Sequence, residues 1–182
     1  MMNFPLETPY HINSTELPTL GTGWVAANNQ GLVAFDFGIP EEDFLTRVFP
    51  KGVSASSSTE TLTIAHPLTS LALRQVGEYL AGERQHFTLP IDWRQFTVFQ
   101  ADVYRAVIAI PFGDTRTYQQ IAAQVNRPRA ARAVGAANGA NPLPIIIPCH
   151  RLVGKDGSLR GYGGKGGIQT KQWLLDHEQQ YS

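Results

Sequence analysis

The sequence predicts an α+β protein of two domains, a small sheet-and-helix domain over residues 1–96 and a mainly helical domain over residues 97–182. Two apolar runs flank a turn near the start, apolar residues recur at helical spacing from residue 67 onward, and the charge balance reverses after residue 96. Residues 1–96 hold 5 Lys/Arg and 10 Asp/Glu, whereas residues 97–182 hold 10 Lys/Arg and 5 Asp/Glu. The basic half can meet phosphates, although a chance imbalance of surface charge explains the numbers equally well.

The first element expected is a β-hairpin. Its strands are the apolar runs 24–27 and 32–37, and an Asn-Asn-Gln-Gly turn between them supplies residues that tolerate positive φ. A serine-rich stretch over 53–61 predicts a polar loop after the hairpin.

Two helices are expected next. The first runs over about 67–80, with Pro67 in its first turn and Gly82 just past its end. The second is capped by Thr97 and stopped by Pro-Phe-Gly at 111–113. Its apolar positions are spaced as one helical face: Phe99, Val103, Ala106, Val107 and Ile110.

A helix-turn-helix is expected after these. Thr117 caps a first helix that runs to about residue 125, residues 126–128 make the turn, and a second helix runs over about 130–138 until Gly139. The second helix has almost none of the long polar side chains that read base edges in the major groove.

The small residues of the second helix allow two interpretations. An alanine-rich helix is commonly buried against a core, and composition alone favours that interpretation. The same smooth face can also lie in the minor groove of DNA, with Arg132 inserted into the base stack. Arginines at 127, 129 and 132 support the second interpretation.

Cys149 is the only cysteine, so an internal disulfide is excluded. It follows Pro-Ile-Ile-Ile-Pro and precedes His150 and Arg151, which can act as a base and as a positive environment for a thiol whose ordinary pKa is near 8.5. A lone buried cysteine beside a histidine is usually inert. Here Asn-Pro-Leu-Pro at 141–144 rigidifies the approach, and a glycine-rich loop at 160–167 can close over a flat ligand.

Other classes of protein are disfavoured. No apolar run approaches the roughly 20 residues of a membrane span, and no basic, apolar leader begins the chain, so we expect a cytoplasmic protein. His11, His66 and His86 lack the spacing of metal ligands, and neither a metal nor a cofactor is predicted.

The stretches "RAVGAANGANPLP", "IPCHRLVG" and "GYGGKGGIQTKQWLLDHE" together closely resemble the methylated-DNA–protein-cysteine methyltransferases, the alkylguanine-DNA alkyltransferases. The resemblance implies a ribonuclease H-like first domain. It also implies monomeric DNA repair, in which the alkyl group on the 6-oxygen of guanine, and also on the 4-oxygen of thymine, passes from duplex DNA to the cysteine. The transfer follows minor-groove binding and base flipping, and each molecule acts once.

Carried over by position, the resemblance implies a role for each member of the reacting group. Cys149 accepts the alkyl group, His150 draws its proton through a bridging water, and Glu178 orients and charge-stabilises that histidine. Asn141 fixes the turn beside the thiol. Tyr118 crowds the phosphate of the flipped nucleotide and can donate a proton as the base leaves.

The resemblance also implies how DNA and the flipped base are held. Arg132 is the finger that enters the stack, and Tyr162 lies against the base. Gly163 stands where some members have serine, which leaves only a backbone amide there. The remaining DNA contacts are Arg129, Ala133, Gly135 and Ala136, and the remaining residues of the base pocket are Pro144 and Arg151.

Three rival functions stay open. Related damage sensors flip the base but carry tryptophan in place of the cysteine, and Cys149 argues against that function. A cysteine hydrolase would use the same thiol and histidine with turnover and without DNA. A DNA-binding regulator would need a more polar recognition helix than the one expected over 130–138.

Overall fold

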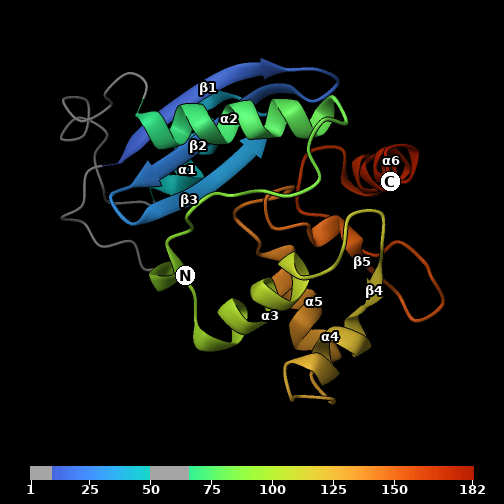
Figure 1. Cartoon of the computed structure of the whole chain (residues 1–182). Coiled ribbons are helices and arrows are strands. Elements are labelled where there is room, and N and C mark those ends of the chain that lie inside the picture. The colour runs from blue at the N-terminus through green and yellow to red at the C-terminus, as the bar shows by residue number, and fades with distance from the viewer. Residues whose placement is uncertain (1–9, 50–65) are drawn as a thin grey trace. The chain divides into compact units, whose positions relative to one another are not determined.

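The computed structural model describes residues 10–49 and 66–182 (Figure 1). The chain forms two compact units, Met1–Gln95 and Phe96–Ser182. The first unit contains a sheet with helices and the second is mainly helical, so the predicted α+β class is confirmed. The polar loop predicted at 53–61 lies outside the described residues.

The sheet of the first unit contains the predicted hairpin. Strand β2 (Gly21–Asn28) pairs antiparallel with β3 (Gly31–Phe37), and β1 (His11–Leu17) completes the order β1-β2-β3. Strand β1 was not predicted, because its sequence is mostly polar and only Leu17 is buried. Gly31 has φ 147°, and a Cβ there would lie 2.7 Å from the backbone carbon of Ile91. Glycine at this position therefore lets the turn approach the segment that leads out of the unit.

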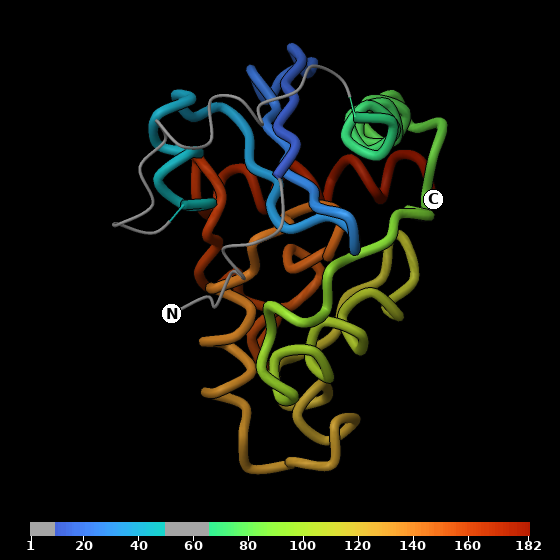
Figure 2. Tube along the Cα trace, turned by 90° about the vertical axis from the view of Figure 1, so that its left-hand side faces the viewer, coloured from blue at the N-terminus to red at the C-terminus, as the bar shows by residue number. Residues whose placement is uncertain are grey.

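Helices α1 (Glu41–Val48) and α2 (Pro67–Leu80) lie on opposite faces of this sheet (Figures 1 and 2). Helix α2 has the predicted bounds, with proline in its first turn. Helix α1 was missed because it is short and buries only Phe44 and Val48.

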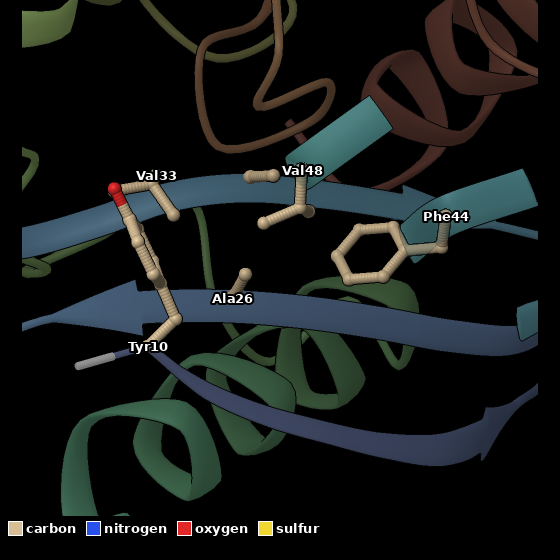
Figure 3. Close-up of a cluster of buried hydrophobic side chains, with 6 residues drawn as sticks. Tyr10, Ala26, Val33, Phe44 and Val48 are labelled. Carbon is tan, nitrogen blue, oxygen red and sulfur yellow. The ribbon is translucent and has the colours of Figure 1, made fainter. Parts of the chain in front are cut away.

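A hydrophobic cluster fills the α1 face (Figure 3). The ring of Phe44 is 1% exposed and stacks on that of Trp24 at 6.1 Å between centroids. The cluster consists of Tyr10, Ala26, Val33, Ala34, Phe44 and Val48. A short 3₁₀ turn, η2 (Trp93–Gln95), ends the unit.

The second unit begins with α3 (Val98–Ile108), followed by α4 (Tyr118–Gln124) and α5 (Ala131–Gly139). These confirm the helix expected from Thr97 and the two helices of the helix-turn-helix. One detail was wrong: Gly139 is the last residue of α5, and Ala140 is the residue that caps it. The helix is thus one residue longer at this end than expected.

The rest of the second unit surrounds a short 3₁₀ turn, η3 (Cys149–Arg151). Strand β5 (Leu152–Val153) follows this turn and pairs in parallel with β4 (Arg116–Thr117), which leads directly into α4. Helix α6 (Gly167–Gln180) closes the unit and was not predicted. The β4–β5 pair therefore brings the start of α4 beside the turn that holds the cysteine.

Thr97 caps α3 through a reciprocal pair of hydrogen bonds, in which its Oγ1 accepts from Gln100 N at 3.2 Å and its N donates to Gln100 Oε1 at 3.0 Å. We expect Thr97→Ala to lower the free energy of unfolding by about 1 kcal/mol, because the helix loses one satisfied N–H group. Denaturant unfolding measures the change. Thr97→Ser keeps the hydroxyl and is the control; equal stability of the alanine and serine variants would contradict the prediction.

Candidate active site around Cys149

Cys149 lies in a tightly hydrogen-bonded turn. Asn141 closes the approach to it, because its Nδ2 donates to Ile147 O at 2.9 Å and its Oδ1 accepts from Leu143 N at 3.0 Å. The backbone then turns again, with Cys149 N donating to Ile147 O at 2.7 Å. Ile145 takes a φ of 70°, which is unusual for a β-branched residue and reflects how tightly the segment is folded.

The thiol is 3% exposed. Burial raises the pKa of Cys149 to about 11, and a hydrogen bond from Asn141 and the positive charge of Lys171 oppose that rise. The resting side chain is therefore a neutral thiol at pH 7, and a reaction at sulfur requires a group that removes its proton.

His150 is fully buried, and its Nε2 lies 2.7 Å from Glu178 Oε1. Burial lowers the pKa of His150 more than the carboxylate raises it, so the ring is neutral at pH 7. A neutral ring beside a carboxylate carries its proton on Nε2. Its Nδ1 is buried and has no hydrogen-bond partner among the described residues. That nitrogen is therefore an available proton acceptor.

Glu178 is held by an unusually complete set of donors. Arg151 donates from Nε to Oε2 at 2.9 Å and from Nη2 to Oε1 at 2.9 Å, and Gly113 N donates to Oε2 at 3.0 Å. Burial alone would raise the pKa of Glu178, but His150 and Arg151 outweigh it and lower the pKa to about 2. The carboxylate is therefore ionised throughout the neutral range.

A pocket of about 610 Å³ lies between α4, α5 and the glycine-rich loop, and Cys149 is not among the described residues that line it. It is lined by Tyr118 from α4, by Arg132 and Gly135 from α5, and by Tyr162 and Gly163 from the glycine-rich loop. The Tyr118 hydroxyl donates to Arg160 O at 3.1 Å, which links α4 to that loop. The glycine at 163 lets the loop approach α5, because a Cβ there would lie 3.0 Å from Gly139 O.

The two faces of α5 differ. Arg132, Ala133 and Ala136 are exposed, and Gly135 is partly exposed. On the inner face, Asn138 is buried and its Nδ2 donates to Cys149 O at 3.2 Å. The alanine-rich helix is thus neither wholly buried nor wholly free, and one side of it supports the cysteine turn. Arg129 is exposed just before the helix.

Two residues expected in the base pocket are located elsewhere. Arg151 is buried, and besides Glu178 its Nη1 binds Ile110 O at 2.6 Å. Pro144 is buried in the turn that follows Asn141. Neither is among the described residues that line the pocket. The family resemblance implied both positions, but the turn at η3 directs Arg151 toward Glu178 of α6.

Sequence reasoning missed three cations of this region. Lys155 and Arg160 line the pocket together with Arg132, and no acidic side chain is among the described residues that line it. Lys171 is fully buried in α6. Its spacing from Leu174 and Glu178 matches one helical face, which is the signal that would have placed it inside.

The described residues contain no group of three or more His, Cys, Asp or Glu side chains placed to hold a metal ion. Within the same ranges, no helix is long and apolar enough to cross a membrane.

Comparison with known proteins identifies the family of both units. A family model described as "6-O-methylguanine DNA methyltransferase, ribonuclease-like domain" matches residues 14–93. A second, described as "6-O-methylguanine DNA methyltransferase, DNA binding domain", matches residues 98–180.

Individual relatives agree. The methylated-DNA–protein-cysteine methyltransferase of Mycolicibacterium paratuberculosis is 50% identical over 111 residues, and this alignment covers 61% of the present chain and 66% of that protein, just under two thirds of its length. The constitutive enzyme of Bacillus subtilis is 42% identical over 142 residues, which cover 76% of this chain and 85% of that one. The crystal structure of Mycobacterium tuberculosis OGT in complex with DNA has a TM-score of 0.74 at 36% identity and covers 94% of both chains. The chain therefore belongs to the 6-O-methylguanine DNA methyltransferase family.

Proposed function

We propose that this protein repairs DNA by transferring the alkyl group from the 6-oxygen of alkylated guanine to Cys149, once per molecule. The observation that carries the proposal is the buried His150–Glu178 pair that directly follows the buried Cys149 in the structure. A neutral His150 offers an unpartnered Nδ1, and an ionised Glu178 holds its other nitrogen. Such an arrangement serves to remove a proton from a buried nucleophile.

The chemical step is a displacement at the alkyl carbon. His150 Nδ1 takes the thiol proton through a bridging water, and Glu178 stabilises the imidazolium that results. The sulfur then forms a bond to the alkyl carbon as the carbon–oxygen bond breaks, and the electron pair of that bond stays on the guanine. Tyr118 supplies the proton that makes the departing base neutral and recovers one from solvent, while the His150 imidazolium releases the thiol proton to solvent, so that no proton is gained or lost overall. The products are an S-alkyl cysteine and guanine.

Access to the lesion requires the nucleotide to leave the duplex, because the thiol is 3% exposed and no duplex can reach it. The exposed small residues of α5 suit close approach to a minor groove, with Arg132 filling the space that the base vacates. The pocket beside Tyr118 and Tyr162 is large enough for one base, and its cations suit the flanking phosphates. Structural relatives support this reading, since one of them was solved in complex with DNA.

We extend the proposal to the 4-oxygen of alkylated thymine, whose exocyclic oxygen presents the same kind of alkyl carbon. The protein is expected to act as a monomer in the cytoplasm, without metal or cofactor. The lack of any second cysteine means that no other thiol of the chain can accept or release the group.

The decisive experiment is transfer of label from a duplex containing labelled O6-methylguanine. We expect one label per protein at completion, carried by the peptide that contains Cys149 and located by mass spectrometry. Cys149→Ala should bind the duplex and take no label. Release of labelled product with repeated turnover would favour a hydrolase, and binding without any label on protein would favour a damage sensor; either result refutes the proposal.

Glu178→Gln tests the proton relay, which is the proposed path from the Cys149 thiol through a water to His150, with Glu178 stabilising the imidazolium. We expect transfer to slow by roughly 10²-fold or more, because a neutral amide no longer stabilises the imidazolium. Affinity for undamaged duplex should change little, since Glu178 is fully buried. Asp176→Asn, an exposed neighbour on the same helix, is the matched control. Single-turnover rates measure both variants, and a wild-type rate for Glu178→Gln would remove it from the relay.

Arg132→Ala tests insertion into the stack. We expect a much larger loss of transfer from duplex than from free O6-alkylguanine, because a free base needs no flipping. Arg132→Lys should recover only part of the duplex rate, since lysine lacks a planar group. If the arginine only binds phosphate, Arg132→Lys should keep the wild-type duplex rate. Arg132→Ala should then bind duplex more weakly, and the slope of its log affinity against log salt concentration should fall by about one. Equal losses on the two substrates would refute insertion.

A further inference from the structure

Lys171 is a charged side chain that the proposed chemistry does not use. It lies on α6 two turns before Glu178 and is fully buried. Its Nζ donates to Leu152 O at 2.5 Å and to Arg160 O at 3.0 Å. It thus joins the strand that follows the cysteine turn to the loop that lines the base pocket, and it lies 5.9 Å from the centre of the Tyr118 ring.

This ammonium group has no carboxylate partner. Both of its hydrogen-bond acceptors are backbone carbonyl oxygens, and no ion pair joins it to any described residue. A buried charge without a counter-charge is costly, and buried lysines are normally paired. Glu178 is not available to it, because Arg151 and His150 already hold both carboxylate oxygens. Among the described residues, the resting protein thus offers Lys171 no compensating anion.

The titratable groups around Lys171 identify one such anion. Cys149 begins the turn that ends at Leu152, and Lys171 binds the carbonyl oxygen of Leu152 at 2.5 Å, so the ammonium group lies beside the cysteine turn. Its positive charge accordingly opposes the rise in the pKa of the thiol. Burial lowers the pKa of Lys171. The other ionisable groups near the thiol are Tyr104 on α3, Tyr118 on α4, His150 and Arg151 on η3, Arg160 in the loop and Glu178 on α6.

We propose that Lys171 is the counter-charge of the Cys149 thiolate, held in place by two backbone carbonyl oxygens until the anion forms. It is a positioning residue, because it does not contact the alkyl group. When the proton passes to His150, the imidazolium is compensated by Glu178 and the new thiolate by Lys171. The net charge of the buried group then stays the same through proton transfer, and each charge gains a neighbour of opposite sign.

The inference deepens the proposed function but can be tested without DNA, because Cys149 is the only thiol. Iodoacetamide alkylates a thiolate and releases iodide, so its rate reports the thiolate fraction of Cys149 at each pH. The rate would be measured on the full-length protein from pH 7 to pH 10. Three variants divide the possible roles of the side chain: Lys171→Met has neither donor nor charge, Lys171→Gln has donors without charge, and Lys171→Arg has both.

If Lys171 supplies charge, its removal raises the pKa of the thiol further, and the thiolate fraction below that pKa falls tenfold for each unit. We expect Lys171→Met and Lys171→Gln to react about tenfold more slowly at pH 8 than the wild type, and Lys171→Arg to recover most of the rate. Lys165→Met, an exposed lysine just before α6, is the matched control and should react as the wild type does.

A purely structural clamp predicts a different pattern. Lys171→Gln would then recover the wild-type rate as well as arginine does, or the four pH profiles would coincide while only the thermal unfolding temperature fell. Either result overturns the inference. Binding to undamaged duplex shows in parallel that each variant is folded.

The transfer reaction separates this inference from the proposed function. With free O6-alkylguanine, the maximal rate of Lys171→Met should fall by the same factor as its iodoacetamide rate. A wild-type protein that accepts no alkyl group would refute the proposed function and leave the iodoacetamide result standing. A wild-type protein that repairs, with profiles unchanged in the variants, would refute the role of Lys171 alone.

Discussion

The buried carboxylate of Glu178 is the interaction on which the second unit depends. It lies near the end of the chain, yet it binds Arg151 and His150 of the cysteine turn and the amide of Gly113 in the turn after α3. Removing the Arg151 side chain would leave a buried carboxylate without its charged partner, which costs several kcal/mol. The contacts that orient His150 in the proposed reaction therefore also hold α6 against the rest of the unit, and stability and the proposed reactivity depend on one carboxylate.

The pKa values of Glu178 and His150 determine how the site responds to acid. The pKa of Glu178 is depressed from 4.5 to about 2, so its contribution to stability is complete above about pH 4.5 and is lost as the pH falls toward 2. The pKa of His150 is lowered instead, which means that the folded state opposes its protonation. Both shifts favour the same pair of charge states, a neutral ring beside an ionised carboxylate, as the pH falls below the ordinary values of the two groups.

The parts of the fold and of the site that depend on neighbouring residues in the chain could be predicted from the sequence. Threonine caps at 97 and 117, the Asn-Asn-Gln-Gly turn and the apolar periodicity of α2, α3 and α4 each specify an element from neighbouring residues. Strand β1 is polar, and α1 buries two side chains, so neither has a clear pattern. In the site, Cys149 and His150 stand out as a pair. The partners of Arg151 and Lys171 depend on contacts between η3, β5 and α6, which no local pattern encodes.

Helix α5 lies between the exposed surface of the unit and the cysteine turn, and two hydrogen bonds fix its position there. Asn138 on its inner side holds the carbonyl of Cys149, and the hydroxyl of Tyr104 holds Ala137 O at 2.8 Å, which fixes the helix to α3. Nine residues of helix are stiff, so the separation between the outer face and the thiol is constant. The helix is thus a spacer of fixed length, and whatever rests on its outer side must send a group across that separation. For the proposed function this means selection by distance: a base that stays in its stack cannot reach the sulfur, however tightly the duplex binds to the outer face of the helix.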